Sequence, residues 1–392
     1  MNGLVPGVKK IAVLNPSAIG DFVVTLPAVH AIKTAYKDAH IVYIGKQWHA
    51  DLLRGRPGPI DDATVIPPVP GVGAPVDIDC DREEIDRFVQ TMQAHRFDLA
   101  FQMYGGGRYS NPLIQQFGAR LTVGLQAPEA EPLDRCIPYV YLQNNRLRML
   151  EVAALAGADR LQLRQELEVT AQDRALAQEA VPATPGKPLI LIHTGASDLR
   201  RRWPTERFAA VADAFAEQGA CIAVNGVEDE ADVVGDVIAR MRHPAVDLCG
   251  KLSLSGLCGL LERAALLVSN DSGPLHLALA IGTPCVGVYW FSNLYVAGPL
   301  AHRNHRIALS LQVECPVCGA ENMVSRCPHD VSFVARVSVD EVLQLGFDLL
   351  RQKREEGDGQ VKQPSRLSDP ADRGYSDAGL DRPAPSGGYR PC

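Results

Sequence analysis

Apolar and amphipathic blocks alternate along the first half of the chain. Residues 10–15 have the continuous apolar pattern of a buried strand, residues 22–36 carry apolar side chains at helical spacing, and residues 40–44 form a second apolar block. A strand, a helix and a strand joined by short links are typical of a βαβ unit in a parallel sheet. We therefore expect an α/β domain here, with a further helix at 83–95 and a strand at 97–102.

The same pattern restarts after a break that contains Pro and Gly at residues 181–187. In this half the periodicity predicts strands at 189–193, 220–224, 266–269 and 285–289 and helices at 205–218, 232–241, 257–263 and 274–280. Two consecutive βαβ series predict two Rossmann-like domains that face one inter-domain cleft.

The predicted order of parts is an N-terminal domain, a C-terminal domain, a helix and a disordered tail, at residues 1–180, 187–338, 339–356 and 357–392. Ser338 and Glu341 have the spacing of a capping box at the start of the helix. The tail contains few large apolar side chains, so it cannot bury a core. Residues 55–79 are rich in Pro and Gly and are expected to be loop and sheet edge.

Composition narrows the class of protein. The 392 residues are 46% apolar and 22% charged, which suits two globular domains. The net charge of −7 argues against general nucleic-acid binding. No apolar run reaches the roughly 18 residues that a membrane span needs, and the first residues lack the pattern of a secretory signal. Ten cysteines, several of them inside apolar blocks, indicate thiols in a reducing compartment, so we expect a cytoplasmic protein.

The segment 269–276 (SNDSGPLH) is a candidate anion site. It follows a predicted strand, and a proline occupies the first position of the predicted helix. The backbone N–H groups of Ser272 and Gly273 and the helix dipole would then favour an anion, and His276 lies in the first turn. Asp271 stands at the carboxyl end of the strand, where open α/β sheets bind ligands. The alternative is an ordinary helix cap.

Three arginines follow the strand at 189–193. The loop at 194–197 (TGAS) is small, and residues 200–204 read RRRWP. Guanidinium groups beside a flexible loop are suited to balance the charge of a pyrophosphate. The alternative is a solvated basic turn.

A third candidate follows the first strand, at residues 17–21 (SAIGD). Gly20 permits a turn, and Asp21 begins a helix on the side of the predicted cleft. A carboxylate there is able to take a proton from an acceptor hydroxyl as a general base. The alternative is a carboxylate that only interacts with the helix dipole.

Cysteine and histidine gather near the end of the second domain. Cys315 and Cys318 form a C-x-x-C pair, and Cys327 and His329 follow with one residue between them. These are ligand types of structural zinc, but the later spacing is not that of a standard finger, so free thiols remain the alternative. Neither G-x-G-x-x-G after the first strand nor G-x-x-x-x-G-K-[ST] occurs, which disfavours a dinucleotide oxidoreductase and a P-loop NTPase.

Taken together, these segments resemble glycosyltransferase family 9, the ADP-heptose:lipopolysaccharide heptosyltransferases, which have the GT-B fold. The matching stretches are IGDFVVTLPAVHAI, HTGASDLRRRWP, NGVEDE and GKLSLSGLCGLLERAALLVSNDSGPLHLALAIGTPCVGVYW. Their order and spacing run through roughly residues 8–345.

The resemblance implies an inverting transfer of a sugar, heptose, from a nucleoside diphosphate donor, ADP-heptose, to an acceptor like the lipopolysaccharide core. Asp21 would be the general base, and the N-terminal domain would bind the acceptor. Within the donor domain Arg201 would hold the phosphates, Glu228 the ribose, Leu252 the adenine and Asp271 the sugar. The remaining donor-site residues implied are Ser197, Ser272, Gly273 and His276, and the acceptor-site residues are Gly20, Arg108 and Asn111. No metal is implied in this chemistry, and no cofactor.

The expected partners are therefore a nucleotide-sugar donor and a glycolipid or other glycan acceptor, and not nucleic acid. The acceptor would bring a cytoplasmic enzyme into peripheral contact with the inner membrane. Two other functions are compatible with the same scaffold: a sugar-nucleotide epimerase or hydrolase, and a non-catalytic module that binds a sugar nucleotide.

Overall fold

The computed structural model describes residues 3–160, 166–301, 303–323 and 326–361. Residues 1–352 form one compact unit, and the contacts described below lie within it. The predicted helix at 339–356 is α12, which spans Val339–Val361. From residue 362 on, the predicted tail lies outside the described residues. The boundaries predicted for the two domains stay predictions.

The first sheet is parallel and six-stranded. Its strands, from one edge to the other, are β3 (Asp62–Val65), β2 (His40–Gly45), β1 (Lys10–Leu14), β6 (Leu99–Gln102), β7 (Leu121–Gln126) and β8 (Arg135–Pro138). The helices of this half are α1 (Ile19–Ala35), α2 (Gln47–Leu53), α3 (Arg82–His95), α4 (Ser110–Gln115) and α5 (Asn145–Ala154). Two short strands, β4 (Val69–Pro70) and β5 (Gly73–Ala74), pair separately.

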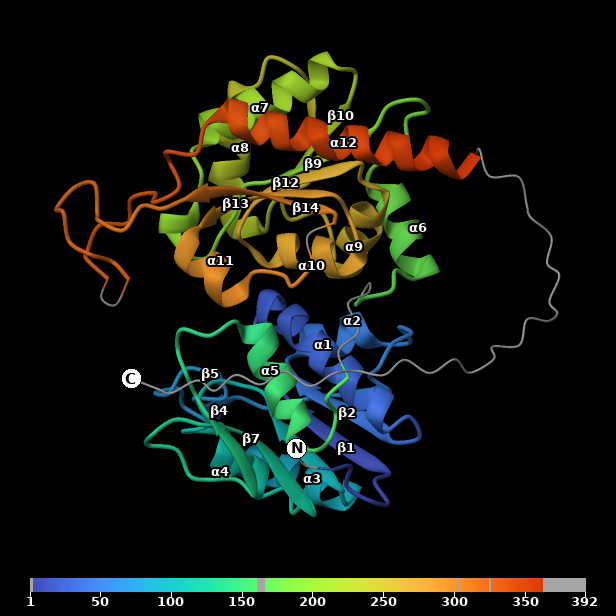
Figure 1. The fold of residues 1–392 in the computed structure, drawn as a ribbon, viewed down its shortest axis with the longest axis vertical. Helices are drawn as coiled ribbons and strands as arrows, with labels where there is room; N and C mark the ends of the chain where they lie inside the picture. The colour runs from blue at the N-terminus through green and yellow to red at the C-terminus, as the bar shows by residue number, and fades with distance from the viewer. Residues whose placement is uncertain (1–2, 161–165, 302, 324–325, 362–392) are drawn as a thin grey trace, which may run out of the picture. The chain divides into compact units, whose positions relative to one another are not determined.

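The second sheet is also parallel and six-stranded. Its order is β11 (Ala245–Asp247), β10 (Cys221–Asn225), β9 (Leu189–His193), β12 (Leu266–Asn270), β13 (Cys285–Trp290) and β14 (His305–Ser310). Its helices are α7 (Thr205–Glu217), α8 (Ala231–Arg240), α9 (Leu254–Arg263), α10 (Gly273–Ile281) and α11 (Phe291–Ala297). Figure 1 shows α7, α8 and α12 on one face of this sheet and α9 and α10 on the other.

Both sheets have the strand order of the Rossmann fold. If the strands are numbered within each sheet, both sheets have the order 3-2-1-4-5-6. Strands 2 and 3 are added on one side of strand 1, and strands 4 to 6 are added on its other side. Ligands of open α/β sheets bind at the carboxyl ends of the strands where the order changes side. This point lies between β1 and β6 in one sheet and between β9 and β12 in the other. The predicted α/β class and pair of Rossmann-like sheets are confirmed.

The strands are apolar on both faces because helices cover both faces. In β9, Ile190 and Ile192 pack into one core cluster with Phe208 and Phe215 of α7. Leu189 and Leu191 alternate with them and pack into the other cluster. A parallel strand covered in this way reads as a continuous apolar run, which is why its sequence predicts it well.

One helix is placed in a way that the sequence did not predict. Helix α6 (Ala171–Ala180) precedes the Pro- and Gly-containing break, yet it packs against α9 of the second half. Gly259 of α9 makes this approach possible, because a Cβ atom there would overlap the carbonyl oxygen of Asp173. Arg56 reaches Asp173 from the first half in a buried ion pair (Nη1 to Oδ2, 2.6 Å).

The start of α12 has one of the two hydrogen bonds of the predicted capping box. The backbone nitrogen of Glu341 donates to the hydroxyl of Ser338 at 3.1 Å. Among the described residues, none of the helices combines the length and the apolar character that crossing a bilayer requires.

Candidate active site

The candidate site forms where the sequences after β9 and β12 meet. These two strands pair in parallel, with Ser269 opposite His193, so the segments that follow them emerge side by side. Asn270 ties the two segments together. Its amide donates to the carbonyl oxygen of Thr194 (2.7 Å), and its Oδ1 atom accepts from the backbone nitrogen of Trp203 (2.9 Å). The loop that carries the three arginines is therefore fixed at both ends to the end of β12.

Asp271 is the centre of a compact charged group. Its side chain is 1% exposed. Its Oδ1 atom lies 3.1 Å from Nε2 of His276, and its Oδ2 atom accepts from Nη1 of Arg201 at 3.1 Å. Arg201 also donates through Nη2 to the hydroxyl of Ser197 at 2.8 Å. Segments 70 residues apart in the chain thus meet at one carboxylate.

The pKa of Asp271 reflects these partners. Burial by itself would raise the pKa of the carboxyl, but the hydrogen bond from His276 and the charge of Arg201 outweigh it and lower the pKa. Asp271 is therefore an ionised carboxylate that accepts hydrogen bonds.

The three arginines have different partners. Arg200 is held by the carboxylate of Asp198 (Nη2 to Oδ2, 2.7 Å) and lies over the ring of Trp290. Arg202 donates through Nε to the carbonyl oxygen of Ala196. Of these three arginines, Arg201 is the one whose guanidinium contacts Asp271 in the described part of the chain. The geometry thus singles out the arginine that the family resemblance indicates.

The start of α10 does not behave as a simple helix cap. Ser272 precedes the helix, but its side chain makes no capping hydrogen bond within the described chain. Its hydroxyl instead lies 3.1 Å from the hydroxyl of Ser269. The carboxylate of Asp271 is hydrogen-bonded to Arg201 and His276. The capping alternative is therefore disfavoured for both Asp271 and Ser272.

The first turn of α1 lies against the same group. A Cβ atom on Gly20 would lie 3.2 Å from Cδ2 of His276, and one on Gly273 would lie 3.1 Å from Cβ of Ile19. Both glycines therefore permit the close approach of α1 to the start of α10. The three segments that the sequence singled out around Asp21, Arg201 and Asp271 are brought together.

Asp21 faces solvent, although protein atoms crowd its surroundings. This crowding raises the pKa of its carboxyl, and the negative charge of Asp271 adds to the rise. The positive charges of His276 and Arg201 act in the opposite direction without cancelling it. A solvent-accessible carboxylate of raised basicity is a suitable proton acceptor.

Several polar atoms at the site have no partner within the described chain. They are buried and include Nδ1 of His276, Nε of Arg201 and Oγ1 of Thr194. Buried polar atoms in proteins are nearly always hydrogen-bonded. Ordered water or a polar ligand is needed to complete their hydrogen bonding.

The other predicted donor residues lie at the carboxyl edge of the second sheet. Glu228 follows β10 and is exposed, with its Cβ atom near Gly250. Leu252 is half-buried and packs near Gly256 at the start of α9. Their roles toward a ribose and an adenine stay predictions.

The two predicted acceptor residues differ in their surroundings. Arg108 is exposed, and its guanidinium lies 5.3 Å from the ring of Tyr109. Asn111 is fully buried, and its amide donates to the carbonyl oxygens of Leu125 (3.0 Å) and Glu131 (2.7 Å). These bonds favour a structural role for Asn111, so contact with an acceptor remains a prediction for it.

The predictions missed Glu230. Its carboxylate covers Gly195, where a Cβ atom would overlap it, and it accepts from the backbone nitrogen of Val227 at 3.1 Å. It therefore lies above the carboxyl ends of β9 and β10. The acidic run 228–230 was visible in the sequence, but the member that points inward was not.

A cavity of about 430 Å³ lies at the C-terminal end of α10. It is lined from the first half by residues that include Pro27 and Arg146, and from the second half by residues that include Leu279 and Ile281. Asp21, Arg201 and Asp271 do not line it.

Comparison with known proteins decides the family. Residues 85–323, more than half of the chain, match the family described as "Glycosyltransferase family 9 (heptosyltransferase)". The chain belongs to glycosyltransferase family 9. The predicted resemblance is confirmed, and the protein is a glycosyltransferase.

Curated relatives of this family 9 member are similar over most of their length. It is 23% identical over 299 residues to the lipopolysaccharide core heptosyltransferase OpsX of Haemophilus influenzae, which covers 73% of the chain and 80% of that relative. It is 23% identical over 317 residues to lipopolysaccharide heptosyltransferase 2 of Salmonella typhimurium, which covers 76% and 88%.

Solved structures agree in fold. A family 9 glycosyl transferase from Veillonella parvula superposes with a TM-score of 0.73 at 21% identity, covering 88% of this chain and 97% of that one. The ADP-heptose lps heptosyltransferase II of Escherichia coli superposes with a TM-score of 0.69 at 18% identity, covering 88% and 99%. The predicted GT-B fold is confirmed.

Proposed function

We propose that this family 9 glycosyltransferase moves a heptosyl group from ADP-heptose to a lipopolysaccharide-core acceptor, with inversion at the anomeric carbon. The names of its relatives support the class of donor and acceptor, since OpsX is described as a lipopolysaccharide core heptosyltransferase and the Escherichia coli structure as an ADP-heptose enzyme. In this proposal the donor binds in domain 187–338 and the acceptor in domain 1–180.

On the donor side, Arg201 and the N-terminus of α10 hold the diphosphate. When the bond between the anomeric carbon and the diphosphate oxygen breaks, its electron pair moves to the diphosphate, whose negative charge grows. A guanidinium and the backbone N–H groups at Ser272 and Gly273 stabilise that charge. The unpartnered polar atoms of His276 and Arg201 support this position for the ligand.

On the acceptor side, Asp21 acts as the general base. The acceptor oxygen attacks the anomeric carbon from the face opposite the diphosphate, and its proton passes to the carboxylate of Asp21. The raised pKa of that carboxyl supports the role, because a more basic carboxylate takes a proton more readily. Asp21 then releases the proton to solvent, to which it is exposed.

The observation that carries the proposal is the meeting of Arg201, Asp271 and His276 with the first turn of α1, which bears Asp21. Anion-holding groups and a basic carboxylate then stand on two sides of one site, as an inverting displacement requires. A lipid-anchored acceptor would bring the enzyme to a membrane surface.

The test is to incubate the enzyme with ADP-heptose, with and without a lipopolysaccharide-core acceptor, and to measure ADP release and the mass of the acceptor. We expect ADP release only with the acceptor, and an acceptor heavier by one heptosyl residue. ADP release without acceptor would favour a hydrolase, and an altered sugar nucleotide would favour an epimerase. Thermal stabilisation by GDP- or UDP-sugars and not by ADP-heptose would contradict the proposed donor.

A further inference from the structure

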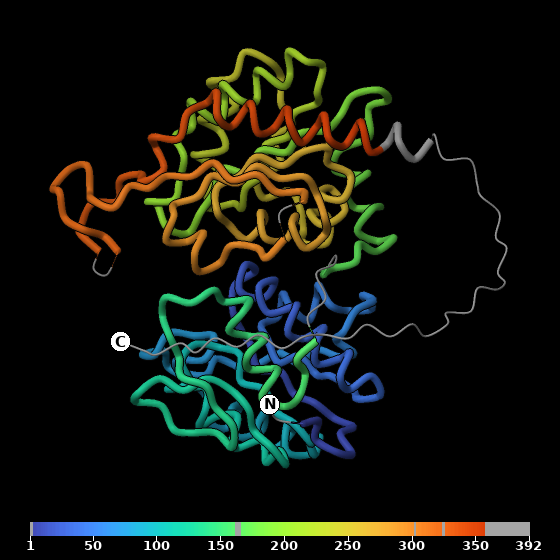
Figure 2. Tube along the Cα trace, viewed as in Figure 1, coloured from blue at the N-terminus to red at the C-terminus, as the bar shows by residue number. Residues whose placement is uncertain are grey.

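A long segment without regular structure follows β14. Between Ser310 and the start of α12 at Val339, the described residues contain neither helix nor strand, and their pairing is limited to a bridge between Glu314 and Glu321. The segment is the orange loop of Figures 1 and 2. Loops of this length are uncommon in compact domains unless they serve a function. Something other than a sheet or helix ladder must hold this one in place.

Its first half is a tight turn that presents two thiols. The backbone nitrogen of Cys315 donates to the carbonyl oxygen of Ala320 (2.9 Å), and that of Gly319 donates to the carbonyl oxygen of Cys315 (2.9 Å). Gly319 has a φ of +72°, which closes the turn and which a side chain would oppose. Cys315 and Cys318 are thereby held on one side of the turn.

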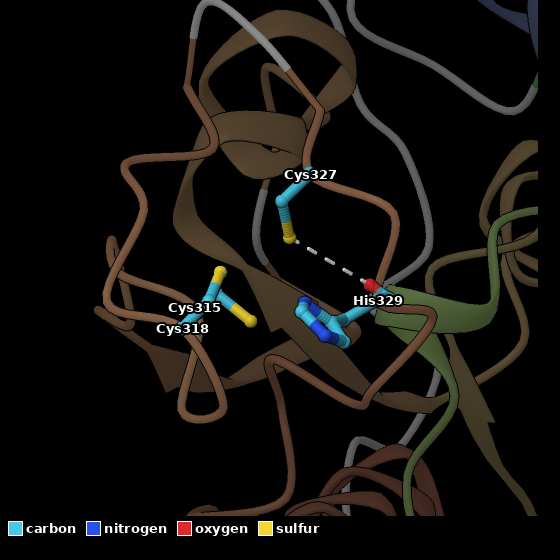
Figure 3. A group of neighbouring side chains, drawn as sticks. All are labelled: Cys315, Cys318, Cys327 and His329. Carbon is cyan, nitrogen blue, oxygen red and sulfur yellow. Dashed lines mark hydrogen bonds between the residues drawn. The ribbon is translucent and has the colours of Figure 1, made fainter.

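The second half returns to this turn through a buried asparagine. Asn322 is 4% exposed. Its amide lies 3.4 Å from the sulfur of Cys327, and its Oδ1 atom accepts from the backbone nitrogen of Cys327 at 3.3 Å. Figure 3 shows the sulfurs of Cys315, Cys318 and Cys327 and the ring of His329 directed into the same space.

The spacing of the four ligand atoms fits a metal ion. The three sulfurs and a ring nitrogen of His329 lie within 4.8 Å of one another. In a tetrahedral site with zinc–sulfur bonds of about 2.3 Å, sulfurs are roughly 3.8 Å apart, so only a small closure is needed. The three cysteines are free thiols. Nδ1 of His329 is buried and lacks a hydrogen-bond partner in the described part of the chain.

We propose that Cys315, Cys318, Cys327 and His329 bind one structural zinc ion. Four protein ligands of the Cys3His type close the coordination sphere, which is typical of structural and not catalytic zinc. Binding at neutral pH releases thiol protons to solvent as the sulfurs become thiolates, and no oxidation or reduction takes place. The ion takes no part in the bond-making and bond-breaking steps proposed above.

The segment that carries the four proposed ligands also contacts Asp198 and Arg200, which directly precede Arg201. Oδ1 of Asn322 accepts from Nη1 of Arg200 at 3.4 Å, and the backbone nitrogen of Phe333 donates to the carbonyl oxygen of Arg200 at 2.8 Å. Asp198, which holds the Arg200 guanidinium, also lies 4.0 Å from Nη2 of Arg326. The zinc ion would therefore fix the loop that positions Arg201, without touching the reacting atoms.

The first test is the metal content of the full chain, purified without added metal or chelator. We expect close to one zinc per chain in the parent and in Cys80→Ser, a matched control because Cys80 lies outside the cluster and is half-buried. Cys318→Ser removes one ligand at an exposed position and should retain well under half of the zinc. Stoichiometric iron, or no bound metal in the parent, would overturn the proposal whether or not the variant folds.

The second test separates a structural from a catalytic ion. Removal of zinc by a strong chelator should lower the Tm of the parent, and added zinc should restore it. ADP affinity, measured by calorimetry, should fall in the metal-free protein and recover with zinc, because the loop before Arg201 loosens. An unchanged Tm after complete zinc removal would overturn the structural role. Should ADP fail to bind the loaded parent, the proposed donor would be wrong while the metal content and Tm would still decide the zinc site.

Discussion

The crossing of α6 and α9 makes a quantitative prediction about two glycines. Gly259 lies inside α9, where an added Cβ atom would overlap the carbonyl oxygen of Asp173 and lie 2.9 Å from the backbone nitrogen of Arg174. Gly235 lies inside α8 and is exposed, and an added Cβ atom there would meet nothing within 4 Å. Gly→Ala substitution at both positions changes the same atoms in opposite surroundings.

The expected free energies follow from these distances. In a helix interior alanine is favoured over glycine by about 1 kcal/mol, so Gly235→Ala should stabilise the fold by up to that amount. At Gly259 the same gain is opposed by overpacking of about 3 kcal/mol, the upper end of the usual range, because the clash is with backbone. The net loss of about 2 kcal/mol places the two variants roughly 3 kcal/mol apart. A displaced α6 would also strain the buried pair of Asp173 with Arg56 and widen the difference.

The assay is urea unfolding of the two variants and the parent, followed by circular dichroism at one protein concentration. Gly235→Ala should unfold at the same or a higher urea concentration than the parent, and Gly259→Ala at a clearly lower one. If Gly259→Ala were as stable as Gly235→Ala, the close crossing of α6 and α9 would be refuted. A Gly235→Ala variant clearly less stable than the parent would refute the helix-propensity part of the reasoning.

Three further predictions concern charged groups. Arg201→Ala should raise KM for the donor and lower kcat in the ADP-release assay, because the guanidinium stabilises the diphosphate both in the bound donor and in the transition state. The control Arg240→Ala, on the exposed face of α8, should change neither constant. Because the pKa of Asp21 is raised above 3.8 and the base must be ionised, kcat/KM should fall on the acid side with a midpoint above pH 3.8; a midpoint below it would argue against Asp21. Arg56→Ala should destabilise the fold by about 3–5 kcal/mol in urea unfolding, because the carboxylate of Asp173 is left buried and unpaired; a loss under about 1 kcal/mol would contradict this.

The sequence predicted most of the strands inside the two sheets because burial on both faces leaves a continuous apolar run. It missed β7, which is also an internal and largely buried strand. The strands at the edges of the sheets were not predicted, because they are less buried and their sequences lack a continuous apolar run. In β3 all four residues are exposed or half-buried, so no apolar run marks it, and the sequence predicted only loop and edge around it. In β14 apolar and polar residues mix, since the strand is covered by a neighbour on one side alone.

The candidate site was predicted as segments and not as contacts. Adjacent arginines are alike in sequence, and a short helical turn at Leu199–Arg201 decides which guanidinium reaches Asp271. The direction of the Asn111 side chain could not be predicted from the sequence either. The family resemblance implies that Asn111 contacts the acceptor, but it lies in α4 and its amide donates to two backbone carbonyls. Side-chain direction in loops depends on tertiary packing, which local patterns do not contain.

The measurement that tests the proposed mechanism most directly compares Asp21→Asn with the parent. If Asp21 only interacts with the helix dipole, its replacement by a neutral isostere costs about 0.3–1 kcal/mol of stability and little activity. If it is the general base, asparagine cannot accept the proton, and the rate falls by about 10²–10⁴. We predict normal folding, ADP affinity close to that of the parent by calorimetry, and acceptor-dependent ADP release lowered at least about a hundredfold. Turnover near that of the parent would contradict the account and leave the base unassigned.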